Sequence, residues 1–258
     1  MSRLWFSTML GAALLVSPQF DAASAADFGT GTDSYLYAQR PLAQTYIEVA
    51  GGIWNIGGSS FGAIGSSGSV NIPIAAGWNF QPELSVLSVF SSSVGTNVTG
   101  VIHAFYRDPQ SHALGVYGGG FGGGAAGGAF VVGLDGLLYM PRTTLYAQAA
   151  YFGGGAVGQG GQLVGTARYF PTDNTRLQGS VGYAASNAGI SVFGLSASAE
   201  MRFDRTPFSA FFTGTYLANT NSTPDAGIVM MGARMYFNND TLFQNDREGV
   251  TTNFVKLF

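Results

Sequence analysis

Apolar and polar positions alternate in segments of about ten residues along most of the chain from Gln44 onward. In residues 190–203, for example, Leu195 falls on one side of the alternation, whereas Glu200 and Arg202 fall on the other. Successive side chains of a β-strand point to opposite faces, so this period predicts strands with one apolar and one polar face. We expect twelve strands, at residues 44–55, 69–80, 84–93, 98–107, 112–119, 128–140, 143–152, 162–170, 175–184, 190–203, 208–217 and 226–237.

Two kinds of connection alternate between these segments. One is short and rich in Pro, Asp, Asn or Arg, as at residues 108–111 and 171–174, where Pro presets φ and Asp or Asn bonds to nearby backbone. The other is longer and rich in Gly, Ser and Asn, as at residues 56–68, 118–128 and 153–161. Short turns on one side and longer loops on the other are typical of an outer-membrane barrel.

Three local features add detail to the strand pattern. Pro73 lies inside the second expected strand and lacks the N–H that a ladder needs, so we expect a bulge or kink there. The third to fifth segments have mixed faces, which leaves ten strands as the alternative to twelve. Aromatic residues collect beside the short turns, with Trp78, Tyr139 and Tyr236 among them, and this favours a girdle at the membrane–water boundary.

The composition points the same way. Charged residues make up 10% of the chain and 39 residues are Gly, whereas a soluble domain has about 25% charged residues. After the N-terminus, no apolar run reaches the roughly 18 residues of a transmembrane helix. A barrel satisfies both observations, because its outer surface is apolar while its strands alternate. We therefore predict an all-β fold, a transmembrane antiparallel up-and-down β-barrel over residues 44–237.

The N-terminus carries the features of a secretory signal peptide. Arg3 precedes an apolar run at residues 4–16, and small residues follow at positions 23–25. This order predicts a signal peptide at residues 1–25, cleaved after Ala25 or alternatively after Ala26, with an uncleaved anchor as the rival interpretation. Residues 26–43 show no clear period and are expected to form a periplasmic segment, and residues 238–258 a polar C-terminal tail.

The last expected strand carries a family resemblance. Residues 229–237 read VMMGARMYF, with apolar residues at alternate positions and a final Phe237. With the signal peptide and the alternating strands, the chain resembles Gram-negative outer-membrane β-barrel proteins of the small porin-like type. The resemblance implies a place in the outer membrane, with lipid and the barrel assembly machinery as partners. Residues 238–258 follow the final Phe, which departs from the family pattern.

Several chemistries have little support. Only 11 basic residues are present, scattered singly, and the net charge is −3, which argues against nucleic acid as a partner. Without Cys and with only His103 and His112, we expect no metal site and no cofactor. Outer-membrane phospholipases and lipid A deacylases are of similar size and use a His–Ser pair, but no such spacing occurs here. A lipid hydrolase is therefore a minor alternative, and we expect no enzyme.

Charged residues on the predicted inner faces are the remaining functional signal. Strands one and twelve must pair to close a barrel, so Glu48 and Arg234 are expected to meet inside. Such groups either set the field and width of a pore or form a satisfied ion-pair network that fills the lumen. The candidate lumen-lining residues are Glu48, Asp135, Arg168, Arg176, Glu200, Arg202 and Arg234, with Tyr46, Tyr139 and Gln148 as polar companions.

Strand number bounds the function. About eight strands fill their own interior and about sixteen leave a water channel, so twelve allow a narrow pore. The leading hypothesis is a narrow passive channel for small solutes. The alternative is a non-conducting structural or surface-interaction barrel that presents Gly/Ser/Asn-rich extracellular loops, and the third is a lipid-modifying enzyme.

Overall fold

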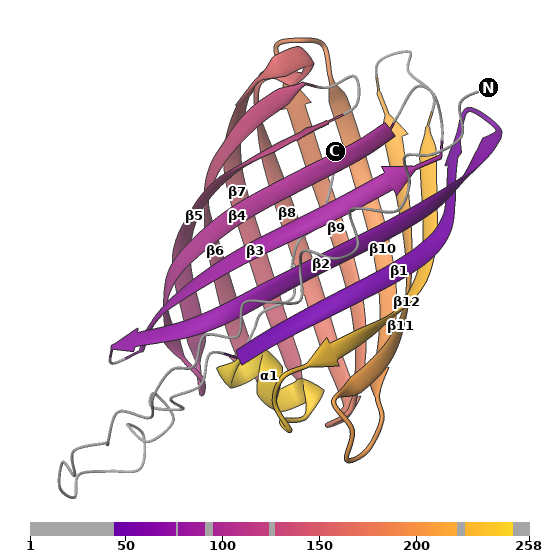
Figure 1. Cartoon of the computed structure of the whole chain (residues 1–258). Helices are drawn as coiled ribbons and strands as arrows, with labels where there is room; N and C mark the ends of the chain where they lie inside the picture. Colours follow the sequence, from indigo (N-terminus) through magenta and orange to yellow (C-terminus); the bar gives the residue numbers. More distant parts are fainter. Residues whose placement is uncertain (1–43, 76, 91–94, 124–126, 221–224, 250–258) are drawn as a thin grey trace, which may run out of the picture. The chain divides into compact units, whose positions relative to one another are not determined.

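The computed structural model describes residues 44–75, 77–90, 95–123, 127–220 and 225–249. Twelve antiparallel strands form a closed barrel, in which each strand pairs with its neighbours in the sequence and β1 pairs with β12 (Figure 1). The predicted twelve-stranded up-and-down barrel is confirmed. The predicted signal peptide, residues 26–43 and the end of the C-terminal tail lie outside the described residues.

The strands are β1 (Gln44–Ile56), β2 (Ser59–Ala75), β3 (Trp78–Val89), β4 (Gly95–Asp108), β5 (His112–Gly123), β6 (Gly128–Met140), β7 (Thr143–Gly154), β8 (Gly158–Thr172), β9 (Thr175–Ser186), β10 (Ser191–Arg202), β11 (Phe208–Asn219) and β12 (Ala226–Tyr236). A 3₁₀ turn, η3 (Gly155–Val157), joins β7 to β8, and one helix, α1 (Leu242–Glu248), follows β12.

Several segments expected to be long loops are strand instead. Gly57 and Gly58, with φ of 55° and 85°, form a two-residue turn, and β2 begins directly after it. Positive φ at both positions is what a type I′ hairpin turn requires. The expected loops at residues 118–128 and 153–161 are likewise largely strand. Glycine has no side chain, so it hides the alternation from which strands are recognised.

The boundary between the second and third strands also differs from the prediction. Residues 81–83 have the composition of a turn, yet they lie within β3, where Gln81 pairs with His103 and Pro82 with Ile102. The chain reverses between Ala75 and Trp78, which pair with each other, and Gly77 has a φ of 83°. The ladder with β4 therefore overrides the turn-forming composition of these residues.

Pro73 marks the expected irregularity in β2. The register with β3 shifts between Pro73 and Ala75. On the other side, the β1 ladder ends where Gln44 meets Asn71, so Pro73 lies beyond the end of that strand. A residue without an N–H is tolerated at such an unpaired edge, and the predicted break in the pairing is confirmed.

The outer surface of the barrel is apolar on all sides. Each strand exposes at least one large apolar side chain, with Ile74, Leu134 and Met231 more than 60% exposed. An apolar surface of this extent suits lipid and not water. One outward residue per strand, from β1 to β12, is Ile47, Ile64, Leu84, Ile102, Leu114, Leu134, Leu145, Leu163, Val181, Leu195, Phe212 and Val229.

The segment after β12, expected to be a polar tail, contains helix α1. Thr241 is its N-cap and accepts a hydrogen bond from the Gln244 backbone N–H, while the Gln244 side chain accepts one from the Thr241 N–H. This reciprocal capping box stabilises a helix too short to persist alone. In the part of the chain that the structure describes, no helix is long and apolar enough to cross a membrane.

Leu242 is the apolar anchor of α1 and is 1% exposed. It packs with Tyr46, Phe170 and Tyr236. Tyr139 and Tyr236, expected in the aromatic girdle, are 5% and 1% exposed and face the interior, whereas Trp78 and Tyr169 face outward and are about half exposed. The girdle prediction is wrong for Tyr139 and Tyr236, because their strand positions fall on the lumen side of the alternation.

Candidate functional site

An apolar ring, made by one buried residue from every strand and Val157 of η3, lines one half of the lumen. Trp54, Val101 and Phe152 are members, and Phe152 is 1% exposed. An apolar lining of this kind disfavours hydrated ions. The buried members of the ring, from β1 to β12 with η3 in its place, are Trp54, Ala63, Val89, Val101, Tyr117, Val131, Phe152, Val157, Val164, Ala184, Val192, Leu217 and Ala226.

A charge network lies on the opposite side of that ring, toward the short turns, and Glu200 of β10 is its centre. Glu200 accepts hydrogen bonds from Arg176 at 2.6 Å, from Ser209 at 2.6 Å and from Tyr236 at 3.0 Å. Arg234 donates to Glu200 and also to Glu48, so one guanidinium bridges two carboxylates. These residues come from β1, β9, β10, β11 and β12, so the network ties the two ends of the sheet together.

Helix α1 is bound to the barrel interior by a second set of polar contacts. Asp246 accepts a hydrogen bond from Thr144 at 2.5 Å and pairs with Arg168, and both charged side chains are 0% exposed. Arg107 donates to the Gly249 carbonyl at 2.6 Å. Strands β4, β7 and β8 therefore hold the helix from three positions.

Arg247 of α1 contacts the barrel as a hydrogen-bond donor, whereas in the preceding contacts the barrel residues are the donors. Its guanidinium donates to the Met140 carbonyl and lies 4.7 Å from the centre of the Tyr139 ring. Burial lowers the pKa of the Arg247 side chain, but the intrinsic basicity of arginine keeps it charged. The helix segment thus accepts hydrogen bonds from barrel side chains and donates to the barrel backbone, and these contacts fix its orientation.

All seven sequence-predicted lumen residues lie on inward faces. Glu48 and Arg234 are register partners and form an ion pair, as do Arg176 and Glu200. Arg202 donates to the Asn238 carbonyl at 2.5 Å and also to the Asp240 carbonyl, next to α1. The structure thus groups the predicted residues into the charge network (Glu48, Arg176, Glu200, Arg234), the α1 contacts (Arg168, Arg202) and a separate site at Asp135.

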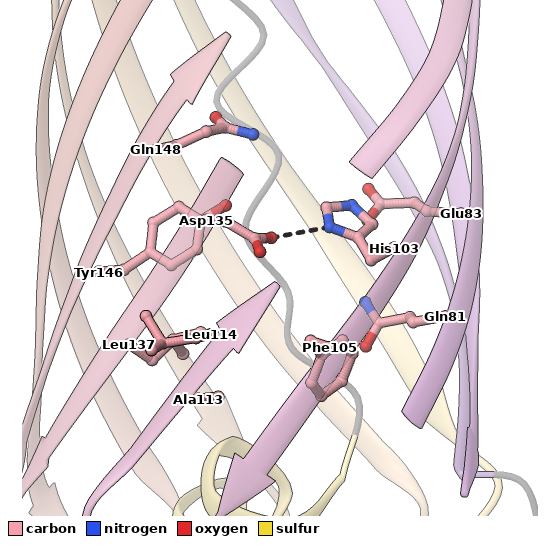
Figure 2. Close-up of a pocket in the computed structure, with 10 residues that line it drawn as sticks. All are labelled: Gln81, Glu83, His103, Phe105, Ala113, Leu114, Asp135, Leu137, Tyr146 and Gln148. Atoms are coloured by element: carbon pink, nitrogen blue, oxygen red, sulfur yellow. Dashed lines mark hydrogen bonds and ion pairs between the residues drawn. The ribbon is translucent and has the colours of Figure 1, made fainter. Parts of the chain in front are cut away.

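Asp135 belongs to a pocket in the wall formed by β3 to β7 (Figure 2). We call it the His103 pocket. His103 Nδ1 lies 2.8 Å from Asp135 Oδ2, and the imidazole stacks on Tyr117 of the apolar ring with 5.1 Å between ring centres. Gln148 is the cross-strand partner of Asp135 and faces the same cavity.

Several residues of the site escape sequence reasoning. Glu83 lines the His103 pocket, but its segment has the composition of a turn, which hid its place on an inner face. Asp246 and Arg247 lie in the expected tail, and no strand period identifies a helix that folds back into a barrel. Arg107 carried a usable signal, since it shares the alternation of His103 and Phe105 on β4.

The other histidine does not form a catalytic relay. Ser111 Oγ lies 2.7 Å from His112 Nδ1, but Asp108 accepts from Ser111 and not from the imidazole. A catalytic triad requires the carboxylate to orient the histidine. Nowhere among the described residues do three or more His, Cys, Asp or Glu side chains gather to hold a metal ion.

Comparison with protein-family models and with curated proteins finds no match. Among solved structures, the fold resembles the KdgM porin in complex with disordered oligogalacturonate, at 10% identity over 75% of this chain and 99% of that chain, with a TM-score of 0.56. The NanC porin matches at 9% identity over 73% and 98% of the two chains, with a TM-score of 0.54. An outer membrane channel from Pseudomonas putida F1 matches at 11% identity over 80% and 100%, with a TM-score of 0.52. At these identities, the likeness shows that the fold is that of outer-membrane channels.

Proposed function

We propose that this chain is an outer-membrane barrel that passes small solutes passively along a narrow lumen. The observation that most supports this function is the closed twelve-stranded barrel, which has an apolar outer surface and a lumen that holds buried polar and charged side chains. Such an inside-out distribution suits a barrel in lipid with a polar interior. The shared fold with the KdgM and NanC porins supports the same function.

The proposed path has three zones. A solute that enters from the loop side meets the apolar ring, then the His103 pocket, and then the charge network beside α1. The ring disfavours ions, and α1 with its buried Asp246–Arg168 pair narrows the opposite end. We therefore expect low conductance compared with wider barrels, because diameter grows with strand number.

Single-channel recording of the purified protein in planar lipid bilayers tests the function. We expect small, resolvable current steps in concentrated salt. A bilayer that stays sealed at all voltages, with the protein shown to be inserted, would overturn the channel function. That result would favour a non-conducting structural barrel. The fully buried contacts of α1 with the barrel interior are the observation that supports this alternative.

Two alternatives have less support than the channel. A surface-interaction barrel needs long extracellular loops, but most of the Gly/Ser-rich residues belong to strands. A lipid hydrolase needs an oriented Ser–His pair, and the pair at Ser111 and His112 lacks the orienting carboxylate.

We further propose export and insertion by the barrel assembly machinery. The predicted signal peptide at residues 1–25 supports export, and the apolar outer surface supports the membrane as the destination. Mass spectrometry of the membrane-extracted protein should give a mature chain that begins at Ala26 or Asp27. An intact Met1 in the extracted protein would contradict the cleavage.

A further inference from the structure

Helix α1 contacts the barrel through a carboxylate that lies in a site built by two strands. In the α1 segment, residues 238–249, Asp246 pairs with Arg168 of β8 and accepts a hydrogen bond from Thr144 of β7. All three side chains are buried. A buried charge is normally paired and hydrogen-bonded, so Arg168 and Thr144 together form a carboxylate site, which the chain's own Asp246 fills.

Two further arginines of the barrel donate to the α1 segment. Arg107 of β4 donates to the Gly249 carbonyl at 2.6 Å, and Arg202 of β10 donates to the Asn238 carbonyl at 2.5 Å. With Arg168, guanidinium groups from three strands therefore bind acceptors of this segment. Guanidinium groups are strong hydrogen-bond donors to carboxylates, so the barrel side of this contact suits an anion.

The helix has little stability of its own, so its position depends on these contacts. It has seven residues, and isolated helices shorter than about 12 residues are marginal in water. Its apolar anchors are Leu242 and Phe243, which both pack near Phe170. An element with few buried apolar contacts opens locally at a lower free energy than the strands of a core. The α1 segment lies where β12 ends, on the side of the short turns (Figure 1).

We propose that the α1 segment is autoinhibitory and that Asp246 keeps it in place by occupying a site for small carboxylate ions. A carboxylate ion that enters from the turn side binds to Arg168 and Thr144 in place of Asp246, and the helix then leaves the end of the lumen. The exchange keeps the buried Arg168 paired with a carboxylate, so the barrel stays folded. The opening of the lumen rests on the proposed channel function, whereas the carboxylate site does not.

The variant Asp246→Ala in the full chain tests the site, because it removes the carboxylate and leaves a space of that size. It should unfold at a lower urea concentration than the unaltered chain in lipid vesicles, because the buried Arg168 charge loses its partner carboxylate. Sodium formate has the atoms of the lost carboxylate and should restore most of the loss, with the concentration dependence of a ligand that binds the folded state. Sodium chloride at the same ionic strength, and the larger propionate ion, should restore little.

Two further variants control this rescue. Asp246→Asn fills the same space with an amide and should not respond to formate. Asp173→Ala removes the carboxylate of the exposed pair with Arg142, so it should show neither a large loss nor a response to formate. Equal effects of formate and chloride on Asp246→Ala, or an equal effect of formate on Asp246→Asn, would overturn the carboxylate site.

Hydrogen exchange of the unaltered chain tests the displacement of the helix. The backbone N–H groups of Asn245 and Gly249, which donate to the Thr241 and Asn245 carbonyls, report on α1. Acetate at about 0.5 M exceeds the millimolar effective concentration of a tethered group and should speed their exchange severalfold, whereas acetamide, its uncharged counterpart, should not. Equal exchange in acetate and acetamide would overturn the displacement. This measurement needs no variant, so it decides the proposal if Asp246→Ala does not fold.

Bilayer recording separates this inference from the channel function. In a barrel that conducts, acetate added on the turn side in constant potassium chloride should raise the current of the unaltered chain and leave that of Arg168→Met unchanged. An unchanged current in the unaltered chain would overturn the autoinhibitory role. A bilayer that stays sealed, together with rescue of Asp246→Ala by formate, would remove the channel and keep the site. A barrel that conducts without selective rescue by formate would keep the channel and remove the site.

Discussion

At the scale of single residues, the pair Arg168–Asp246 is the most demanding contact, because neither side chain is exposed to solvent. Burying two charges costs more than their attraction returns unless further hydrogen bonds satisfy them, and Thr144 supplies one. Arg168→Met leaves the Asp246 carboxylate buried without its cation. We expect the free energy of unfolding to fall by about 3–5 kcal/mol, measured by urea titration of the barrel in lipid vesicles.

An exposed ion pair provides the control for this substitution. Arg142 and Asp173 are paired with side chains 51% and 55% exposed, and Arg142→Met should cost less than about 1 kcal/mol. Adding Asp246→Asn to Arg168→Met should recover part of the loss, because the uncompensated charge disappears. Equal losses for the two single variants would contradict a special role for the buried pair.

Gly133 shows how a glycine that obscures the strand pattern serves the packing. A Cβ at this position would lie 2.6 Å from the Tyr117 ring and 2.5 Å from the Ala149 carbonyl oxygen. Gly133→Ala should therefore reduce the free energy of unfolding by about 1–3 kcal/mol through overpacking. Gly179→Ala, where a Cβ would meet no atom within 4 Å, should be nearly neutral in the same urea titration, and a similar loss there would contradict the packing argument.

The residues of the charge network could be found from the sequence, but their partners could not. Alternation alone places Glu48, Glu200 and Arg234 on inner faces, since a charge on the opposite face would meet lipid. Which carboxylate meets which guanidinium depends on the register of the ladders, which sets Glu48 against Arg234 and Arg176 against Glu200. The Glu48–Arg234 contact was predictable because barrel closure requires β1 to meet β12.

At the scale of elements, we propose that α1 narrows the lumen, and removal of the helix tests that role directly. A chain that ends at Phe237 lacks the helix and should conduct severalfold more current than the full chain, because the barrel pairs are complete at Tyr236. A chain that ends at Gly249 keeps α1 and should retain low conductance. Equal conductance of the two truncated chains in planar bilayers would contradict a narrowing role for the helix.

The strands from β6 onward agree with the sequence prediction within a few residues, whereas β2 and β3 do not. In β10 and β12, large apolar side chains alternate with charged or small polar ones, so the period is visible. In β2, Gly and Ser occupy much of the region before Val70, and the turn-like residues 81–83 belong to β3. Their strand conformation comes from pairing with β1 and β4, which local composition does not report.

At the scale of the whole molecule, the apolar outer surface makes the bilayer part of the folding environment. Leu195 lies near the middle of β10 and is 47% exposed on that surface. Leu195→Arg should lower the free energy of unfolding in lipid vesicles by about 2–4 kcal/mol, because an arginine near the midplane must leave water. Phe208→Arg, at the turn-side end of β11, should cost about 0–1 kcal/mol. A larger loss at Phe208 than at Leu195 would contradict the proposed position of the barrel in the membrane.

The sequence by itself determined that this chain forms a closed membrane barrel with charged groups inside, because a period of two with few charges has no other stable arrangement in lipid. Only the tertiary structure decided what fills the lumen. The apolar ring, the His103 pocket and the residues that bind α1 each bring together several strands. Such contacts depend on the register of the strand pairs and on the closure of the barrel. The element that binds inside the end of the barrel is a helix from the expected tail, held by arginines whose partners lie up to 142 positions away along the chain.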